Sequence, residues 1–237
     1  MTKSKKALER KARKRKEREK RLKRQRGLRS SADLGSSDDR QEEEIPFGGF
    51  EMERIMRRAG RVADGEVHGS LEALREKLDA MIGEGAILEE ELSDPIERAQ
   101  EFAYRALESR DRVAGKALAE EALALDPDCV DALGLLAVHE SDLAKQEQGL
   151  RRAIAAGERT LGGRAFFEEH AGRFWGLVRT RPYMRARQTL AELLSHENRL
   201  DEAARELEEL LALDAADNQG ARGSLLALCL QQGEATK

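Results

Sequence analysis

Aromatic residues are scarce in this sequence: they make up 4% of 237 residues, and there are only four prolines. Both scarcities favour helices over sheets, because strands are enriched in aromatic side chains and proline interrupts helices. No uninterrupted apolar stretch approaches the roughly 18 residues that a membrane-spanning helix needs. The basic N-terminus also lacks the apolar core of a secretory signal. We therefore expect an all-α cytoplasmic protein that inserts no segment into a membrane.

Motifs that carry chemistry are also lacking. The two cysteines, Cys129 and Cys229, show no metal-ligand spacing, and we expect both to be reduced thiols in the core. None of the four histidines has a ligand neighbour at the spacing of a metal site. We find no phosphate-binding loop, calcium loop or nucleophile elbow. The sequence therefore predicts no catalytic residue, no metal site and no cofactor, and indicates a non-enzymatic role.

Charge is distributed very unevenly along the chain. Residues 1–30 contain sixteen lysines and arginines against three glutamates, a net charge of +13. The other 207 residues carry 26 basic and 43 acidic side chains, a net charge of −17. Residues 3–26 have no apolar stripe, and their like charges repel at helical spacing. We predict that residues 1–44 form a disordered or loosely helical basic arm that ends in a polar linker at 27–44.

A basic arm on an acidic body indicates a partner with phosphates, such as RNA, DNA or the ribosome. The alternative is that the arm covers the acidic body of its own chain until a partner displaces it. No aromatic residue is available in the arm for stacking on bases, so nucleic-acid binding would be independent of sequence. The candidate phosphate-binding residues are Lys11, Arg13, Lys14, Arg15, Lys16, Lys20, Arg21, Lys23 and Arg24.

Residues 45–93 have the pattern of short, loosely packed helices separated by glycines. Two helical faces are predicted here, and they are built from Met52, Ile55, Met56 and Ala59 and from Leu71, Leu74, Leu78 and Met81. A more strongly specified helix begins after Asp94. Asp94 is a candidate N-cap, Pro95 fills the first helical position, and Glu97 would complete a capping box.

From residue 94 to residue 237 the pattern is helix, short turn, helix, with a period near 34 residues. The clearest unit covers residues 184–217, and residues 96–129 and 130–163 match it through small residues at equivalent positions. Residues 218–232 supply one more helix. The alternative is a helical bundle without repeats, in which the spacing is fortuitous.

These units resemble the tetratricopeptide-repeat family over about residues 95–232. The segment FWGLVRTRPYMRARQTLAELL, residues 174–194, is similar to one found in bacterial tetratricopeptide proteins of unassigned function. The resemblance implies an α-solenoid of about three helix pairs plus a terminal helix. In such arrays the first helices of the pairs line a concave surface that binds a peptide or a helix. We therefore expect a protein-binding scaffold or adaptor.

An aromatic segment interrupts the repeats at residues 164–181, where we predict an inserted helix. Five of the nine aromatic residues, Phe166, Phe167, Phe174, Trp175 and Tyr183, fall within 18 positions. One interpretation is that they pack across the gap between repeats, and the other is that part of the cluster lines a ligand groove. Phe167, His170, Phe174, Leu177 and Val178 would share one face of this helix.

Arginines follow the aromatic segment, and arginine with aromatic residues often dominates binding energy at interfaces. They suit a partner with an acidic or carboxylate end and one apolar anchor. The alternative is that they pair with the acidic helix around Glu202, Glu206 and Glu209. The candidate protein-binding residues are Phe174, Trp175, Tyr183, Arg185, Arg187 and Arg222.

Overall fold

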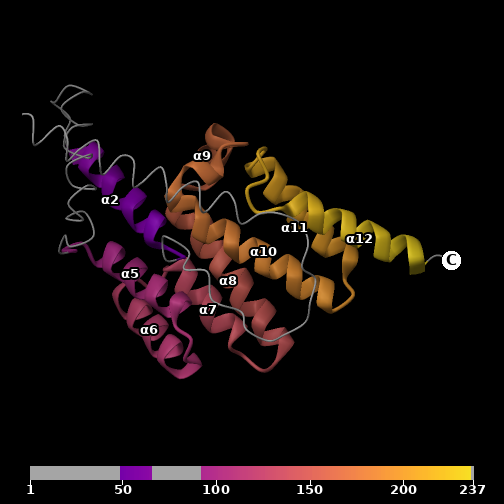
Figure 1. Cartoon of the computed structure of the whole chain (residues 1–237), viewed down its shortest axis with the longest axis horizontal. Helices are drawn as coiled ribbons and strands as arrows, with labels where there is room; N and C mark the ends of the chain where they lie inside the picture. Colours follow the sequence, from indigo (N-terminus) through magenta and orange to yellow (C-terminus); the bar gives the residue numbers. More distant parts are fainter. Residues whose placement is uncertain (1–48, 66–91, 236–237) are drawn as a thin grey trace, which may run out of the picture. The chain divides into compact units, whose positions relative to one another are not determined.

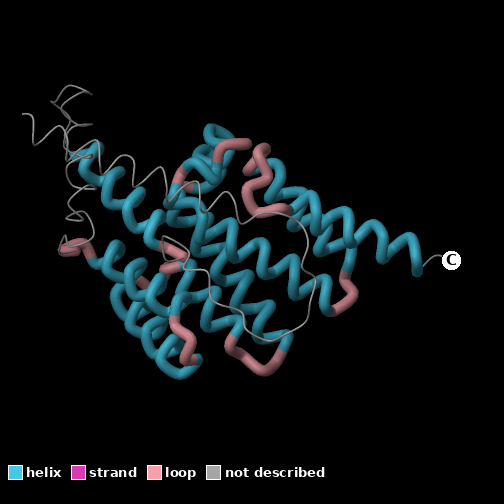
Figure 2. The backbone as a smooth tube through the Cα atoms, viewed as in Figure 1, coloured by secondary structure: helices cyan, strands magenta, loops and turns pink. Residues whose placement is uncertain are grey.

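The structure is a computed structural model that describes residues 49–65 and 92–235, and structural statements concern these residues. Two units divide the chain, residues 1–44 and 45–237. The basic arm, and with it every predicted phosphate-binding residue, lies outside the described residues, as does the predicted face at 71–81. The described elements are all helices, and no strand occurs among them (Figure 2). No described helix is long and apolar enough to cross a membrane.

Helices pack in sequential pairs, which confirms the predicted all-α class (Figure 1). Each pair joins two antiparallel helices through a short turn, and a single helix follows the third pair. The pairs are α5 (Pro95–Glu108) with α6 (Arg112–Leu125), α7 (Val130–Val138) with α8 (Leu143–Leu161), and α10 (Arg181–His196) with α11 (Leu200–Leu213), and the last helix is α12 (Ala221–Ala235).

Aspartates begin several of these helices. Asp94 accepts a hydrogen bond from the backbone N–H of Ile96 at 3.0 Å, with Pro95 at the first helical position, as predicted. Asp111 and Asp142 cap α6 and α8 in the same way. Glu97, predicted to close a capping box at α5, instead has its carboxylate paired with an arginine of another helix. Aspartate caps therefore fix where α5, α6 and α8 begin.

Small residues let neighbouring helices approach closely. Between the first and second pairs the buried apolar cluster is built almost entirely from alanine, together with Cys129. A methyl group added to Gly149 of α8 would lie 2.6 Å from the Cβ of Ala137 in α7, and one added to Gly157 would lie 2.7 Å from the ring of Tyr183. These glycines are the positions at which helix contacts leave no room for a side chain.

Larger side chains fill a second cluster, which extends from α7 to α12 and includes Leu150, Leu190 and Leu194. Cys129 is buried, as predicted, and burial raises the pKa of its thiol to about 12. Cys229 was predicted to be a core thiol, and this is wrong, because it lies on the exposed side of α12. The helix covers α11 with its other side, through Ala221 and Leu228.

The predicted single helix at 164–181 is wrong. The structure has α9 (Gly163–His170), followed by two short 3₁₀ helices, η1 (Phe174–Gly176) and η2 (Val178–Thr180). Gly172 stops α9, since its φ of 77° is left-handed and its backbone pairs with Ala212 and Ala215 near the end of α11. Residues before and after Gly172 therefore do not share one helical face.

We predict that Gly149→Ala destabilises the protein even though alanine favours helix by about 1 kcal/mol. The added methyl group meets Ala137, and overpacking costs about 1–3 kcal/mol. Gly134→Ala in α7 is the matched control, because nothing lies within 4 Å of its added methyl group. Urea denaturation should show the control at least as stable as the wild type and Gly149→Ala less stable. Equal midpoints for the two variants would contradict the packing argument.

Candidate protein-binding face

First helices of the pairs share one face, which we call the first-helix face. It contains a cleft of about 310 Å³ between α7 and α10. The side chains that line the cleft come from α5, α7 and α10, with Gln219 just before α12, and none comes from α6, α8 or α11. Leu107, Val130, Leu135 and Val138 make its apolar part. The cleft is therefore lined by the first helices and by Gln219.

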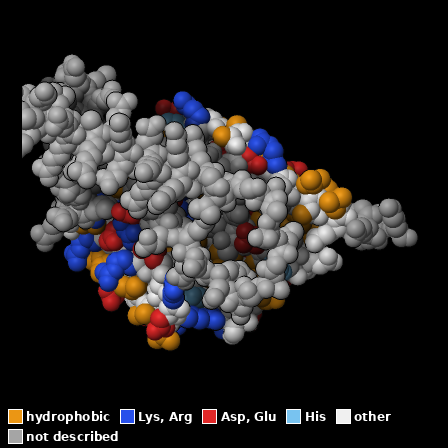
Figure 3. Space-filling view, in the orientation of Figure 1, with side chains coloured by type: hydrophobic (Ala, Val, Ile, Leu, Met, Phe, Trp, Pro, Cys, Tyr) orange, Lys and Arg blue, Asp and Glu red, His pale blue; other side chains and the backbone are white. Residues whose placement is uncertain are grey.

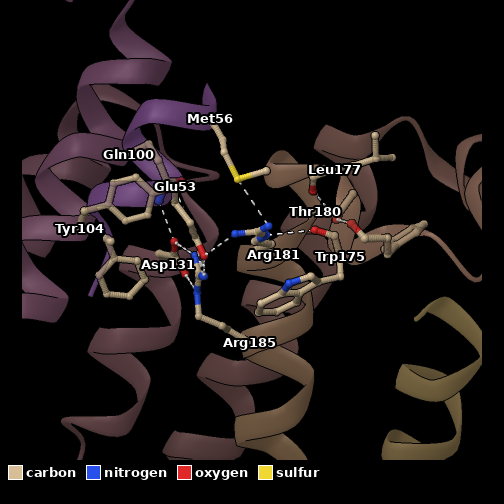
Figure 4. Close-up of polar contacts among 12 residues, drawn as sticks. Glu53, Met56, Gln100, Tyr104, Asp131, Trp175, Leu177, Thr180, Arg181 and Arg185 are labelled. Carbon is tan, nitrogen blue, oxygen red and sulfur yellow. Dashed lines mark hydrogen bonds and ion pairs between the residues drawn. The ribbon is translucent and has the colours of Figure 1, made fainter. Parts of the chain in front are cut away.

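An ion cluster lies at the edge of this cleft (Figure 4). Arg185 of α10 donates two hydrogen bonds to the Asp131 carboxylate, at 3.0 and 2.7 Å, in the bidentate geometry that favours Arg–carboxylate pairs. Asp131 belongs to α7 and is only 5% exposed. Gln100 of α5 donates to the same carboxylate at 2.6 Å. The first helices of all three pairs are thus joined by one buried carboxylate.

Glu53 adds a fourth element to the ion cluster. It lies on α2 (Glu51–Gly65), is 6% exposed, and accepts hydrogen bonds from Arg185 at 2.8 and 3.1 Å. The hydroxyl of Tyr104 donates to Glu53 at 3.1 Å. Burial disfavours the charged guanidinium, but the carboxylates of Asp131 and Glu53 more than offset this effect, so the pKa of Arg185 lies above its ordinary value. Burial raises the pKa of Tyr104, which stays a neutral donor.

Arg181 links the aromatic segment to this cluster. Its Nε donates to the carbonyl oxygen of Trp175 at 3.0 Å, and its guanidinium lies 4.6 Å from the centre of the indole ring. A terminal nitrogen lies 3.5 Å from the Glu53 carboxylate. Thr180 donates to the carbonyl oxygens of Phe174 and Leu177, which holds the turn that carries Arg181. Trp175 therefore positions an arginine and is itself half-buried.

The helix α2 runs antiparallel to α5. Arg54 pairs with Glu101 at 3.0 Å and with Glu108 at 2.9 Å, and Arg57 pairs with Glu97 at 2.7 Å. Hydrogen bonding from Arg54 is the main reason that the pKa of Glu108 lies below its ordinary value. Figure 3 shows acidic and basic side chains interspersed on the described surface facing the viewer. Ion pairs between long side chains therefore hold α2 against α5.

The inward side of α2 differs from the prediction. The predicted apolar face included Met52, which is 46% exposed, whereas Glu53 and Arg58 are buried. At its N-terminal end, Phe50 stacks on Tyr104 with ring centres 5.0 Å apart, and the Arg185 guanidinium lies 5.1 Å from the Phe50 ring. Polar residues face inward because charged groups of α5 and α10 lie there and pair with them. The predicted apolar face is therefore not the most buried side of this helix.

Aromatic residues predicted to bind a partner are largely core. Phe174 is fully buried and packs with Phe166 and Phe167, and Tyr183 is almost fully buried and packs with Phe167 and Phe174. For Phe174 and Tyr183 the packing interpretation is right and the groove interpretation is wrong. Burial raises the pKa of Tyr183 to about 12. Phe174 and Tyr183 therefore fill the space between the second and third helix pairs.

The three predicted arginines do not form one site. Arg187 lies near Glu206 at 3.4 Å and Glu209 at 3.6 Å, which confirms the alternative of pairing with the acidic second helix. Arg222 is exposed and lies 3.5 Å from Asp217 in the turn before α12. Only Arg185 lies at the cleft, and there its charge is already paired with carboxylates.

Sequence reasoning missed Asp131 and Glu53. Asp131 had a usable signal, because it is the one charged residue in the apolar helix VDALGLLAV and a buried carboxylate requires a partner. Glu53 had no such signal, since many glutamates surround it in sequence. Within the described residues, no group of three or more His, Cys, Asp or Glu side chains could hold a metal ion.

We predict that Arg185→Ala lowers the free energy of unfolding by about 3–5 kcal/mol, because it leaves the buried Asp131 carboxylate without its cation. Arg222→Ala is the control and should change it by less than about 0.5 kcal/mol, as expected for an exposed side chain. Chemical denaturation of both variants measures the difference. A loss for Arg185→Ala no larger than that of the control would show that the pair contributes nothing.

Comparison of the chain with known protein families, curated proteins and solved structures found no match. The fold is therefore described by its own helices, as sequential pairs with an aromatic segment between the second and third. The likeness to tetratricopeptide repeats rests on the sequence pattern.

Proposed function

We propose that this protein is a non-enzymatic, tetratricopeptide-like scaffold that binds a peptide or helix of another protein on the first-helix face. The observation that carries the proposal is the cleft between α7 and α10, which only first helices and the residue before α12 line. Repeat arrays present their binding surface on the same helices. Sequential pairing and the close contacts at Gly149 and Gly157 also suit such an array.

The chemistry of the cleft favours an apolar anchor with polar flanks. Its apolar part is formed mainly by side chains of α5 and α7, together with Pro182 and Ala186 of α10. The polar groups along one side are supplied by Gln188, Thr189 and Glu192 of α10. Arg185 is already paired with the carboxylates of Glu53 and Asp131. It therefore gives no reason to expect the partner with an acidic or carboxylate end that the sequence predicted. A partner that inserts one apolar side chain and hydrogen-bonds along α10 fits the cleft best.

We predict that Gly134→Leu abolishes partner binding while the fold is kept. A side chain at Gly134 projects into open space at the cleft and would occupy it. Ala117→Leu on α6 is the matched control, since it adds a similar side chain to an exposed second helix. Affinity capture with quantitative mass spectrometry compares the two with wild type. Identical sets of captured proteins for all three would place the partner site elsewhere.

A second candidate function is binding of RNA, DNA or the ribosome through the basic arm. The observation that favours it is the net charge of +13 over residues 1–30. Phosphate neutralisation by lysine and arginine releases counterions and makes binding strongly dependent on salt. In this function the helical pairs would recruit a second protein.

We predict that the full chain binds single-stranded RNA and duplex DNA without sequence preference, and that affinity falls at least tenfold between about 50 and 200 mM salt. Deleting residues 1–30 should remove this binding. Titrations of both forms with two unrelated sequences provide the measurement. Binding that survives the deletion, or that ignores salt, would rule out the arm as the binding element.

A further inference from the structure

The helix α2 covers part of the first-helix face, and its described side chains, residues 51–61, lie outside the apolar core. Neither of the two buried apolar clusters contains a described residue of α2. Its attachment consists of ion pairs, hydrogen bonds, and the stacking of Phe50 on Tyr104 just before the helix begins. Detaching α2 would therefore uncover Tyr104 but would leave both apolar clusters of the three helix pairs intact.

The buried polar side chains of α7 and α10 beneath α2 remain paired without it. Arg185 and Asp131 keep their two mutual hydrogen bonds, and Gln100 keeps its bond to Asp131. Arg181 keeps the carbonyl oxygen and the indole ring of Trp175. Glu53 would leave the ion cluster for water, and the hydroxyl of Tyr104 would lose Glu53 as its hydrogen-bond acceptor. The polar part of the face is therefore formed in advance of any ligand, which lowers the cost of binding one.

Charge on α5 selects what can bind there. Glu97, Glu101 and Glu108 follow one another at spacings of four and seven residues and so lie along one side of the helix. All three pair with arginines of α2. Without α2 they would be three like charges in a row, facing the same side as Arg181 and Arg185. A ligand that neutralises this row needs two or more basic residues on one helical face.

We propose that the first-helix face binds a basic amphipathic helix of a partner protein, and that α2 occupies this site in cis until the partner helix displaces it. The inference rests on the proposed function, because it names the partner class for the same face. The pattern that α2 presents defines the ligand: an aromatic residue, an acidic residue three positions later, and arginines four and seven positions later. In this chain these are Phe50, just before α2, and Glu53, Arg54 and Arg57 of α2.

The test uses a fluorescent synthetic peptide with the sequence of residues 49–65 and full-length protein. Tethered α2 competes at a high effective concentration, so the wild-type chain should bind the peptide weakly. The full-length Arg54→Ala/Arg57→Ala variant loses its pairs with α5 and should bind the wild-type peptide at least tenfold more tightly in fluorescence anisotropy. A peptide with both arginines changed to glutamate should not bind either protein.

A charge-matched control separates displacement from net charge. Lys116→Ala/Arg164→Ala also removes two positive charges, but from exposed pairs within single helices, and should bind the peptide as the wild type does. Equal peptide affinity of the α2 variant and this control would overturn the proposal. If circular dichroism shows the α2 variant unfolded, full-length Phe50→Ala replaces it. Phe50 lies outside both apolar clusters, and its loss removes the stacking on Tyr104 and the contact of its ring with Arg185 but no ion pair.

Two further outcomes are informative. A wild-type chain that sediments as a dimer would assign the face to α2 of a second copy and would overturn the proposal of a partner protein.

The Gly134→Leu variant separates this inference from the proposed function. If peptide binding fails but Gly134→Leu still abolishes partner capture, the cis ligand is wrong and the scaffold function stands. If the peptide binds the loosened variant but Gly134→Leu captures every partner, the cleft is wrong and the inference stands.

Discussion

The pairing of Arg185 with Asp131 is the interaction on which the arrangement of the first helices depends. A carboxylate buried to this degree is costly unless a cation and hydrogen-bond donors satisfy it. The bidentate guanidinium comes from the third pair, the carboxylate from the second, and the amide of Gln100 from the first. Directional bonds at one point therefore fix the register of three helices that small apolar residues alone would let slide.

The aromatic segment provides the space in which this cluster forms. Phe166, Phe167 and Phe174 pack with Tyr183 between the second and third pairs, and Gly157 leaves the room that Tyr183 needs. Beyond this aromatic core the chain turns through η1 and η2 and delivers Arg181 to the face, one helical turn before Arg185. The segment that interrupts the repeat thus contributes aromatic side chains to the core and places Arg181 on the first-helix face.

Local signals in the sequence were sufficient for the helices and insufficient for the site. The Asp94 cap and a period near 34 predicted the start of the first pair and the succession of helices, because both are visible in the local sequence pattern. The break at Gly172 escaped prediction, since a glycine within a helix and one with positive φ look alike in sequence. The bond between Glu53 and Arg185 joins residues 132 positions apart, and no local pattern reports such a distance. The buried face of α2 was mispredicted for the same reason. Charged residues far away in sequence, and not the apolar residues of the helix, determine which side faces inward.

The described residues of α2 are attached through polar contacts, whereas the paired helices pack through buried apolar side chains. An apolar helix face, once buried, becomes part of the core, because exposing it again costs free energy in proportion to its area. Ion pairs between partly exposed side chains, such as Arg54 with Glu108, contribute little each and weaken as salt rises. Several such pairs in a row still specify position and partner, since each arginine must meet a carboxylate at the right spacing. The face beneath keeps its own buried pair in place, so the same surface can be both rigid and exchangeable.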